Sequence, residues 1–196
     1  MPVDPAAALK SCRSGRIVTI DTAEVNGHAF LGVMGIGFDA IVADRFAAST
    51  TRGLETYVKE GLVAFAHFQA EEYEVIANGQ TIRQKAFVIA VANSGQYGNN
   101  ARVAPLASLR DGLLDVVIVN DTTLVGAAML LARLFTGTFH RSDSVTMLQT
   151  AAVTIRRPAA GIAQLDGEPV TLPEELHVRV RPQSLNLLVP DSATEF

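Results

Sequence analysis

The sequence is poor in the residues that mark several common classes of protein. It holds one cysteine and no tryptophan in 196 residues, which excludes an internal disulfide and a metal site built from clustered cysteines. Only 18% of the residues are charged and the formal net charge is −4. The basic residues are dispersed, so we expect no nucleic-acid partner and no polybasic membrane anchor. A reducing, cytoplasmic compartment fits the single cysteine.

Long apolar runs are also missing, although the chain as a whole is apolar. Nothing near the start resembles a secretory signal, and the longest run, 124–135, is interrupted by Arg133 and is too short to cross a bilayer. The four histidines lie far apart, so no zinc site is expected. Hydrophobic residues nevertheless make up 48% of the chain, more than is usual for a globular domain. Part of that apolar surface is therefore expected to face a partner.

Turn and strand signals dominate the rest of the sequence. The pair Asn26-Gly27 lies between the strand-like segments 16–21 and 28–33, and Asn78-Gly79 lies between two others. Both pairs predict type I′ hairpins of an antiparallel sheet. Further strands are predicted at 113–119, 145–148, 151–156, 161–165, 176–181 and 185–189.

Helices are predicted at 40–48 and 54–68, and a third runs from a cap at Asp121 or Thr122 to about Phe135. We therefore predict an α+β, mainly β fold, namely an antiparallel β-sandwich with two to three inserted helices. Residues 15–190 are assigned to this sandwich. Residues 1–14 read as a linker with a short helix, and 191–196 as a tail.

Asp166-Gly167-Glu168 is the most informative candidate site. In an extended backbone, residues two apart project to the same side, so Asp166 and Glu168 can converge on one proton, metal ion or hydroxyl. The alternative is an ordinary Asp-Gly turn followed by a solvated glutamate. On the first interpretation, replacing Asp166 by Asn is expected to cost little stability, because a catalytic carboxylate is usually not a packing residue.

Three other segments have both a structural and a functional interpretation. In the segment 35–40, Asp39 either caps a helix or holds a substrate hydroxyl, with nearby glycines allowing close approach. The polar loop 93–100 either lines a site or is a flexible turn. The segment 108–113 is either a simple turn or, through Asp111, a site for a hard cation such as Mg²⁺.

Four motifs in this order carry a family resemblance: G-I-G-F-D-A at 35–40, V-A-N-S-G-Q-Y-G at 91–98, A-P-L-A-S-L-R-D-G-L-L-D-V at 104–116 and L-D-G-E-P at 165–169. Together they resemble the diacylglycerol kinase catalytic family, and most closely the C-terminal domain of the bacterial soluble lipid kinases related to sphingosine kinases. The resemblance implies a two-domain enzyme. An N-terminal α/β domain with a G-G-D-G-T loop binds ATP, and a C-terminal β-sandwich supplies catalytic and lipid-binding groups.

The resemblance also implies roles for individual residues. One of the D-G-E acids, Asp166 or Glu168, accepts the proton of the lipid hydroxyl. Asp39 holds headgroup hydroxyls, while Asn93 and Gly95 line the cleft. Asp111, with backbone oxygens of Ser108 and Leu113, binds Mg²⁺. ATP is the co-substrate.

No G-G-D-G-T motif occurs in the sequence. We therefore expect the C-terminal half of an ATP-dependent lipid kinase, inactive by itself, whose partners are the missing N-terminal ATP-binding domain and a diacylglycerol-like or sphingoid-like lipid. Peripheral membrane contact and homo-oligomer formation are further expectations. The alternative is a non-catalytic lipid-binding or regulatory module that pairs with a kinase domain on another chain.

Overall fold

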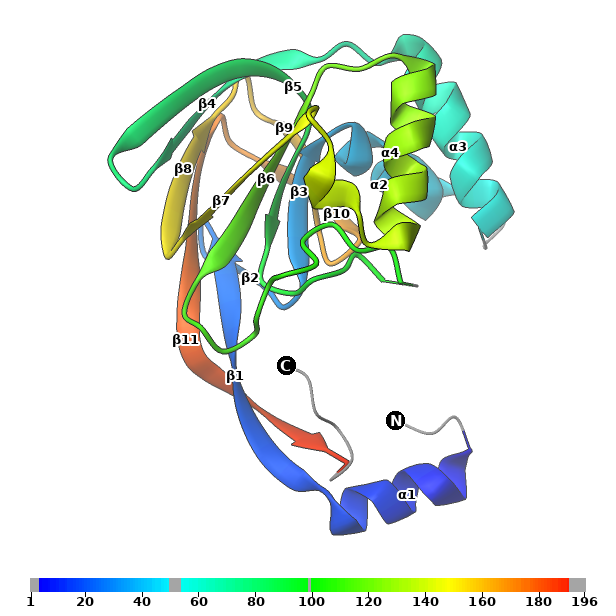
Figure 1. The fold of residues 1–196 in the computed structure, drawn as a ribbon, viewed down its shortest axis with the longest axis vertical. Coiled ribbons are helices and arrows are strands. Elements are labelled where there is room, and N and C mark those ends of the chain that lie inside the picture. Colours follow the sequence, from blue (N-terminus) through cyan, green and yellow to red (C-terminus); the bar gives the residue numbers. More distant parts are fainter. Residues whose placement is uncertain (1–3, 50–53, 99, 191–196) are drawn as a thin grey trace.

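A computed structural model describes residues 4–49, 54–98 and 100–190, and Figure 1 shows their arrangement. The helices are α1 (Pro5–Ser14), α2 (Phe38–Ala48), α3 (Leu54–His67), α4 (Leu124–Thr136) and the short 3-10 helix η1 (Phe139–Arg141). The strands are β1 (Arg16–Val25), β2 (His28–Phe30), β3 (Val33–Gly37), β4 (Glu71–Ala77), β5 (Gln80–Ala92), β6 (Leu114–Asn120), β7 (Val145–Thr150), β8 (Ala152–Arg156), β9 (Gly161–Leu165), β10 (Glu168–Leu172) and β11 (Glu175–Val189). Strands predominate, which confirms the predicted class. The predicted tail, 191–196, lies outside the described residues.

The described strands form one eleven-stranded sheet in the order β10-β9-β3-β5-β4-β8-β11-β1-β2, with β6 paired to β5 and β7. Figure 1 shows this sheet curled round on itself. Side chains from distant strands, among them Phe30, Met34, Ile118 and Leu176, pack into one buried core inside the curl. The predicted antiparallel β-sandwich is confirmed, and its two layers are parts of one continuous sheet.

Helices α2, α3 and α4 cover the outer face of the central strands. The rings of Phe38 in α2 and Phe87 in β5 stack at 4.5 Å between centroids, and Phe65 of α3 lies 5.8 Å from Phe38. Strand β6 is therefore buried on both faces, which explains why its residues 116–119 are continuously apolar rather than alternating. None of the described helices is both long and apolar enough to cross a membrane.

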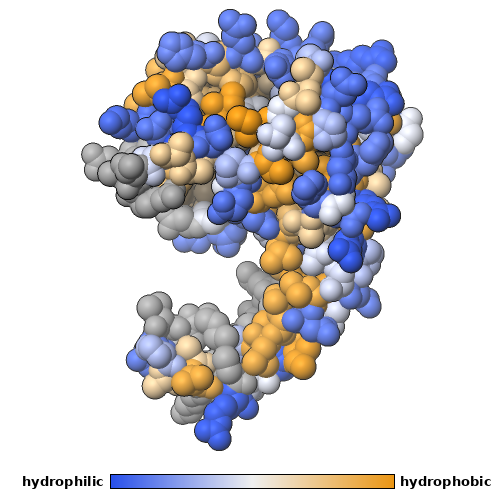
Figure 2. All heavy atoms as spheres, turned by 180° about the vertical axis from the view of Figure 1, so that it is seen from behind, coloured by the Kyte–Doolittle hydropathy of each residue, from blue (hydrophilic) through white to orange (hydrophobic). Residues whose placement is uncertain are grey.

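Strands β1 and β11 extend beyond the sandwich as a two-stranded ribbon with α1 at its end (Figure 1). Val18, Ile20 and Val189 form a small core of their own there. On the opposite side of the ribbon, the cross-strand partners Ile17 and Leu188 are 71% and 42% exposed. The next pair on that side, Thr19 and Asn186, is polar and hydrogen-bonded. Figure 2 shows apolar residues following the ribbon downward from the sandwich.

Both Asn-Gly hairpins are confirmed. Asn26 and Gly27 have φ values of 47° and 87°, and Asn78 and Gly79 have values of 51° and 73°. Positive φ at both central residues is the type I′ turn, which only glycine and a few short polar residues adopt readily. Local chemistry alone was sufficient to predict these two turns.

Other boundaries differ from the predictions. The segments 176–181 and 185–189 are one strand, β11, because both pair with β1 on either side of a bulge between Ile20 and Thr22. The predicted strand 28–33 is interrupted at Leu31-Gly32. Strand β10 was not predicted at all.

The N-cap of α4 also differs from the prediction. It is Thr123, whose Oγ1 accepts a hydrogen bond from Gly126 N at 3.2 Å. The predicted candidates, Asp121 and Thr122, lie two positions and one position before this cap. Gly137 ends the helix with φ 67°, as its sequence position indicated.

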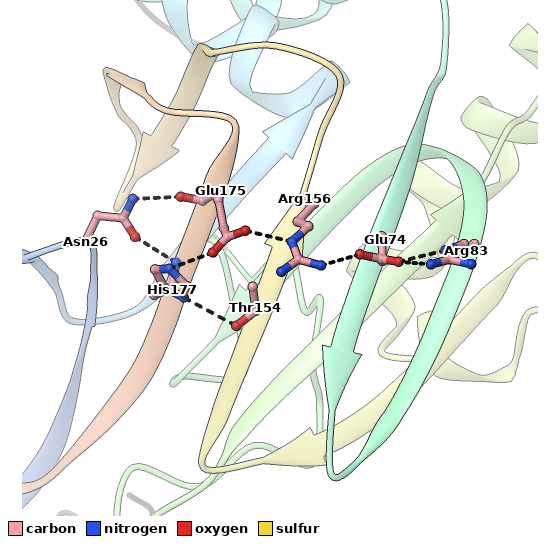
Figure 3. Close-up of polar contacts among 7 residues, drawn as sticks. All are labelled: Asn26, Glu74, Arg83, Thr154, Arg156, Glu175 and His177. Carbon is pink, nitrogen blue, oxygen red and sulfur yellow. Dashed lines mark hydrogen bonds and ion pairs between the residues drawn. The ribbon is translucent and has the colours of Figure 1, made fainter.

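The outer face of β4, β8 and β11 carries a row of ion pairs, shown in Figure 3. Arg156 lies at its centre, with Nε 2.6 Å from Glu175 Oε2 and Nη1 2.8 Å from Glu74 Oε2. Glu74 also accepts from Arg83, and Glu175 from His177. Hydrogen bonds from Arg156 lower the pKa of both carboxylates. The row therefore links four strands, β5, β4, β8 and β11, across the solvent-facing side of the sheet.

Candidate functional site

The D-G-E segment forms the tight turn of the β9–β10 hairpin. Asp166 and Gly167 have φ values of 51° and 90°, so the extended backbone assumed in the sequence analysis is wrong at Asp166. Glu168 begins β10 opposite Leu165. Its carboxylate is exposed and has no hydrogen-bond partner among the described residues. The two acids therefore project from a turn rather than from one strand.

The carboxylate of Asp166 accepts three backbone hydrogen bonds. Leu31 N donates to Oδ2 at 2.7 Å, and the amides of Gly32 and Val33 donate to Oδ1 at 2.7 and 3.0 Å. The amides of Leu31 and Gly32 belong to the interruption between β2 and β3, and the amide of Val33 begins β3. Their contact with Asp166 accounts for the break in the predicted strand. The expectation that Asp166 contributes little to stability therefore changes, because charge-assisted hydrogen bonds are among the stronger ones in proteins.

The loop after β5 packs against the same interruption. The amides of Asn93 and Ser94 both donate to Gly32 O, at 2.8 and 3.1 Å. A Cβ on Gly32 would lie 3.0 Å from Asp166 Oδ1 and 3.2 Å from Ser94 Oγ. Gly95 is similarly close to the segment that contains Ala104, because a Cβ on Gly95 would lie 3.0 Å from Ala104 O. The glycines at 32 and 95 thus allow three segments to meet.

Asn93 lies behind this loop rather than on its surface. Its side chain is fully buried, and Nδ2 donates to Leu31 O at 2.8 Å and to Asp21 O at 3.1 Å. Its Oδ1 has no hydrogen-bond partner. In this structure Asn93 therefore holds two segments together, and its influence on a bound molecule would be indirect.

Asp39 lies in the first turn of α2, where Gly37 rather than Asp39 is the N-cap. Its Oδ1 accepts from Ala40 N at 2.8 Å, and its Oδ2 accepts from Tyr97 Oη at 3.1 Å and from Gln164 Nε2 at 3.3 Å. Burial raises the pKa of Asp39 to about 7, against the lowering effect of these three donors. Asp39 can therefore bind a hydroxyl as an acceptor and can also change its protonation near neutral pH.

The space beside Gly35 is filled by Asp39 itself. A Cβ on Gly35 would lie 1.8 Å from Asp39 Oδ2, and one on Gly37 would lie 2.6 Å from Phe87 O. The sequence predicted that these glycines would admit a substrate. The structure instead shows that they admit a carboxylate of the same chain and a neighbouring strand.

The third predicted group, Ser108, Asp111 and Leu113, lies in the turn before β6. Asp111 is exposed, and its Oδ1 accepts from Leu113 N at 3.0 Å. No cluster of three or more Asp, Glu, His or Cys side chains with metal-binding geometry occurs among the described residues. A cation bound here would therefore depend on one carboxylate and backbone oxygens. Such all-oxygen donors fit Mg²⁺, which keeps several of its waters.

Asp21 connects this turn to the other segments and was missed by the sequence analysis. It is 1% exposed, and its carboxylate accepts from Gly112 N at 2.8 Å and from Gln183 N at 2.7 Å. Its backbone oxygen receives the hydrogen bond from Asn93. An acid at the end of a predicted apolar strand was the one signal that could have identified it.

Gln164 and Tyr97 were also missed as individual residues. Tyr97 lies inside the selected loop 93–100, whereas Gln164 lies one residue before the L-D-G-E-P motif, in the predicted strand 161–165. The structure brings Asp39, the 93–98 loop, the 31–33 interruption and the D-G-E turn into one hydrogen-bonded group. The 108–113 turn joins that group through Asp21.

Comparisons with known proteins bear on the family and the fold of the chain. A family model described as the YegS C-terminal NAD kinase beta sandwich-like domain matches residues 32–189. A protein of Pectobacterium atrosepticum named "Probable lipid kinase YegS-like" is 30% identical over 196 residues, covering 93% of this chain and 64% of the relative. A Yersinia pestis protein of the same name is 26% identical over 195 residues, covering 97% and 64%.

Among solved structures, a diacylglycerol kinase from Bacillus anthracis matches with a TM-score of 0.70 and 16% identity. That match covers 98% of this chain and 61% of the other, and at this identity it shows a common fold. The chain thus spans less than two thirds of the length of each of these proteins.

Proposed function

The chain belongs to the family of YegS C-terminal, NAD kinase beta sandwich-like domains, and we propose that it is the acceptor-binding part of a lipid kinase. In this proposal the γ-phosphoryl group of ATP is transferred to a hydroxyl of diacylglycerol or a related lipid. The relatives named as lipid kinases support the reaction class. The nucleotide would be bound by a separate ATP-binding domain of the G-G-D-G-T type.

One observation carries the proposal. Asp39 and the Asp166-Gly167 turn are connected through a single side chain, Gln164, although 125 residues separate Asp39 from Gln164 in sequence. Phosphoryl transfer requires mainly positioning and charge stabilisation from the protein. A carboxylate that holds a hydroxyl beside a turn with two further acids meets that requirement.

The roles follow from the contacts of each group. Asp39, with acceptor oxygens and a pKa of about 7, would hold the acceptor hydroxyl, and Asp166 or Glu168 would take its proton. Gly95 would keep the loop close to the site and Asn93 would hold it from behind. Asp111, with backbone oxygens of Ser108 and Leu113, would hold Mg²⁺, which supplies positive charge beside the phosphates.

The partners are proposed on the same basis. The exposed apolar pair of the β1–β11 ribbon, Ile17 and Leu188, would contact the ATP-binding domain. Contact with the membrane surface that holds the lipid would be peripheral. Association between copies of the chain would bury the same kind of exposed apolar surface, and it would therefore compete with binding of the ATP-binding domain.

Phosphate transfer from labelled ATP to micelles of diacylglycerol or of a sphingoid base, with Mg²⁺, tests the proposal. The chain is assayed alone and joined to the ATP-binding domain of a YegS-like relative. We expect transfer in the joined protein and little in the chain alone. The matched control is the joined protein carrying Asp166→Asn together with Glu168→Gln.

The outcomes are distinct. Transfer that depends on the two acids supports the lipid kinase and names the preferred lipid. A joined protein that folds and binds ATP but transfers nothing to either lipid contradicts the proposal. It would favour instead the non-catalytic module that pairs with a kinase domain.

A further inference from the structure

Gln164 has a buried side chain whose amide nitrogen and amide oxygen both form hydrogen bonds. It lies in β9 and is 3% exposed. Its Nε2 donates to Asp39 Oδ2 at 3.3 Å, and its Oε1 accepts from Gly167 N at 2.8 Å. A backbone amide can only donate, so the amide oxygen must face Gly167 and the amide nitrogen must face Asp39. The side chain therefore has one orientation.

The neighbouring strand is built around this contact. Gly35 of β3 is the cross-strand partner of Gln164. A Cβ on Gly35 would lie 1.8 Å from Asp39 Oδ2 and 2.9 Å from Gln164 Nε2. No residue larger than glycine fits there without moving the Asp39 carboxylate, because interiors are close-packed. Gly35 thus leaves the space in which Asp39 and Gln164 meet.

Core packing alone does not account for a glutamine at this position. Burying an amide costs free energy unless its hydrogen bonds are made, whereas methionine has nearly the same shape and no such requirement. The two bonds that Gln164 makes end on two different candidate motifs, on α2 and on the β9–β10 turn. A link between those motifs is what the polar side chain adds.

We propose that Gln164 is a positioning residue that holds the Asp39 carboxylate in register with the Asp166-Gly167 turn, so that a hydroxyl bound at Asp39 is presented to the acids of that turn. This inference rests on the proposed phosphoryl transfer to a lipid hydroxyl. Tyr97, which donates to the same oxygen of Asp39 at 3.1 Å, holds the carboxylate from the other side.

The same contacts influence the proton affinity of Asp39. Burial raises its pKa, and the hydrogen bonds from Gln164, Tyr97 and Ala40 N oppose that rise. Besides Tyr97, the charge of Asp39 acts on Tyr73 of β4, whose pKa is raised by burial, then by Glu71 and to a lesser extent by Asp39. Loss of the Gln164 donor therefore raises the pKa of Asp39 further.

The first test uses the chain without any substrate. Carboxyl resonances are followed by NMR during a pH titration of the wild type, Gln164→Met and Gln149→Met. Gln149 of β7 is the matched control, because its Nε2 donates to a different buried carboxylate, that of Asp115 in β6, at 3.5 Å. We expect the Asp39 midpoint, near 7 in the wild type, to rise only in Gln164→Met.

The second test is kinetic and uses the chain joined to an ATP-binding domain. Gln164→Met is expected to lower kcat/KM for the lipid by about tenfold or more, which corresponds to the loss of one positioning contact. The KM for ATP should not change, and Gln149→Met should behave like the wild type. Gln164→Glu keeps the acceptor for Gly167 N but adds a like charge beside Asp39. Its activity should therefore appear at higher pH than that of the wild type.

The outcomes separate this inference from the proposed function. An unchanged Asp39 midpoint in folded Gln164→Met overturns the inference, whatever the assay shows. A shifted midpoint with wild-type kinetics and pH profile in both variants also overturns it. If the wild-type joined protein transfers no phosphate while the midpoint shifts as expected, the proposed function has failed and the positioning role falls with it. A loss of stability alone would not shift the pH profile.

Discussion

At the residue scale, Asp166 is both a candidate proton acceptor and a structural anchor. Its carboxylate receives three amide hydrogen bonds. In Asp166→Asn one oxygen becomes an NH₂ group, which faces an amide donor. We expect unfolding free energy to fall by about 1.5–3 kcal/mol, the range for hydrogen bonds to charged groups. Turnover in the joined protein should fall by orders of magnitude. Denaturant unfolding and the phosphate-transfer assay measure the two effects.

Glu168→Gln is the matched control for this change. The Glu168 carboxylate is exposed and has no partner among the described residues, so its unfolding free energy should stay within about 0.5 kcal/mol of wild type. Equal stabilities for the two variants would contradict the anchoring role of Asp166. Full turnover in one variant would assign proton transfer to the other acid.

The raised pKa of Asp39 predicts that stability depends on pH with a sign that is unusual for an acid. Its folded-state pKa is raised from 3.8 to about 7, so the folded protein binds this proton more tightly than the unfolded chain does. Stability from this group is therefore greatest below about pH 4 and declines as pH rises to about 7.

Asp39→Asn removes that decline. Between about pH 4 and pH 8, we expect the wild type to lose up to about 4 kcal/mol of unfolding free energy relative to the variant. Urea unfolding at a series of pH values gives the difference directly. Parallel curves for the two proteins would show that Asp39 titrates as an ordinary acid.

At the scale of elements, the ion pairs on β4, β8 and β11 predict a contribution to the free energy of unfolding that depends on salt. The pKa values of Glu74 and Glu175 are lowered, first by hydrogen bonds from Arg156. Their stabilising effect is therefore present above the ordinary glutamate pKa and is lost as pH falls through the lowered values.

Arg156→Ala should destabilise the protein slightly at neutral pH and low salt. The loss should shrink in about 1 M salt, which screens exposed charges, and at acid pH. Unfolding curves at two salt concentrations measure it, with the exposed Arg141, which has no ion-pair partner in the described structure, replaced by Ala as the control. A loss that salt does not change would point to packing of the arginine stem instead.

The start of α4 supplies a second prediction for an element. Thr123 Oγ1 accepts from Gly126 N, whereas Thr122 makes no such bond. Thr123→Ala should cost about 1 kcal/mol, as other N-cap removals do, and Thr122→Ala should cost much less. Thermal or denaturant unfolding of the two variants distinguishes them, and the reverse order would return the cap to Thr122.

At the scale of the whole molecule, Asp21 joins parts of the chain that lie far apart. Its carboxylate accepts from Gly112 N in the 108–113 turn and from Gln183 N in β11. Asp21→Ala leaves both amides without this acceptor, at about 1–3 kcal/mol for each that water does not reach. We expect lower stability and faster hydrogen exchange of the Gly112 amide.

Asp111→Ala is the control for Asp21. The exposed Asp111 contacts only its own turn, through Leu113 N, so its loss should change the Mg²⁺ dependence of the joined protein while leaving global stability nearly intact. If Asp21→Ala changes neither stability nor exchange, Asp21 does not hold the turn.

The sequence by itself determined the features that depend on neighbouring residues. Asn-Gly pairs predicted two hairpins because few other residues adopt positive φ. Apolar segments predicted most strands, and the four motifs contain Asp39, the 93–98 loop, the 108–113 turn and the D-G-E turn. Residues 31–33, Asp21 and Gln164 lie outside those motifs. Local patterns failed at boundaries that pairing sets, such as the single long β11 and the break at Leu31-Gly32.

Only the tertiary structure decided what each selected residue contacts. Asp166 meets the amides of 31–33, which lie 133 or more residues away, and Asp39 fills the space that Gly35 leaves. Gln164 connects the two, and Asn93 is buried where the sequence suggested a cleft. Spacing along the chain carries no information about such contacts, because hydrogen bonds across a curled sheet depend on which strands become neighbours.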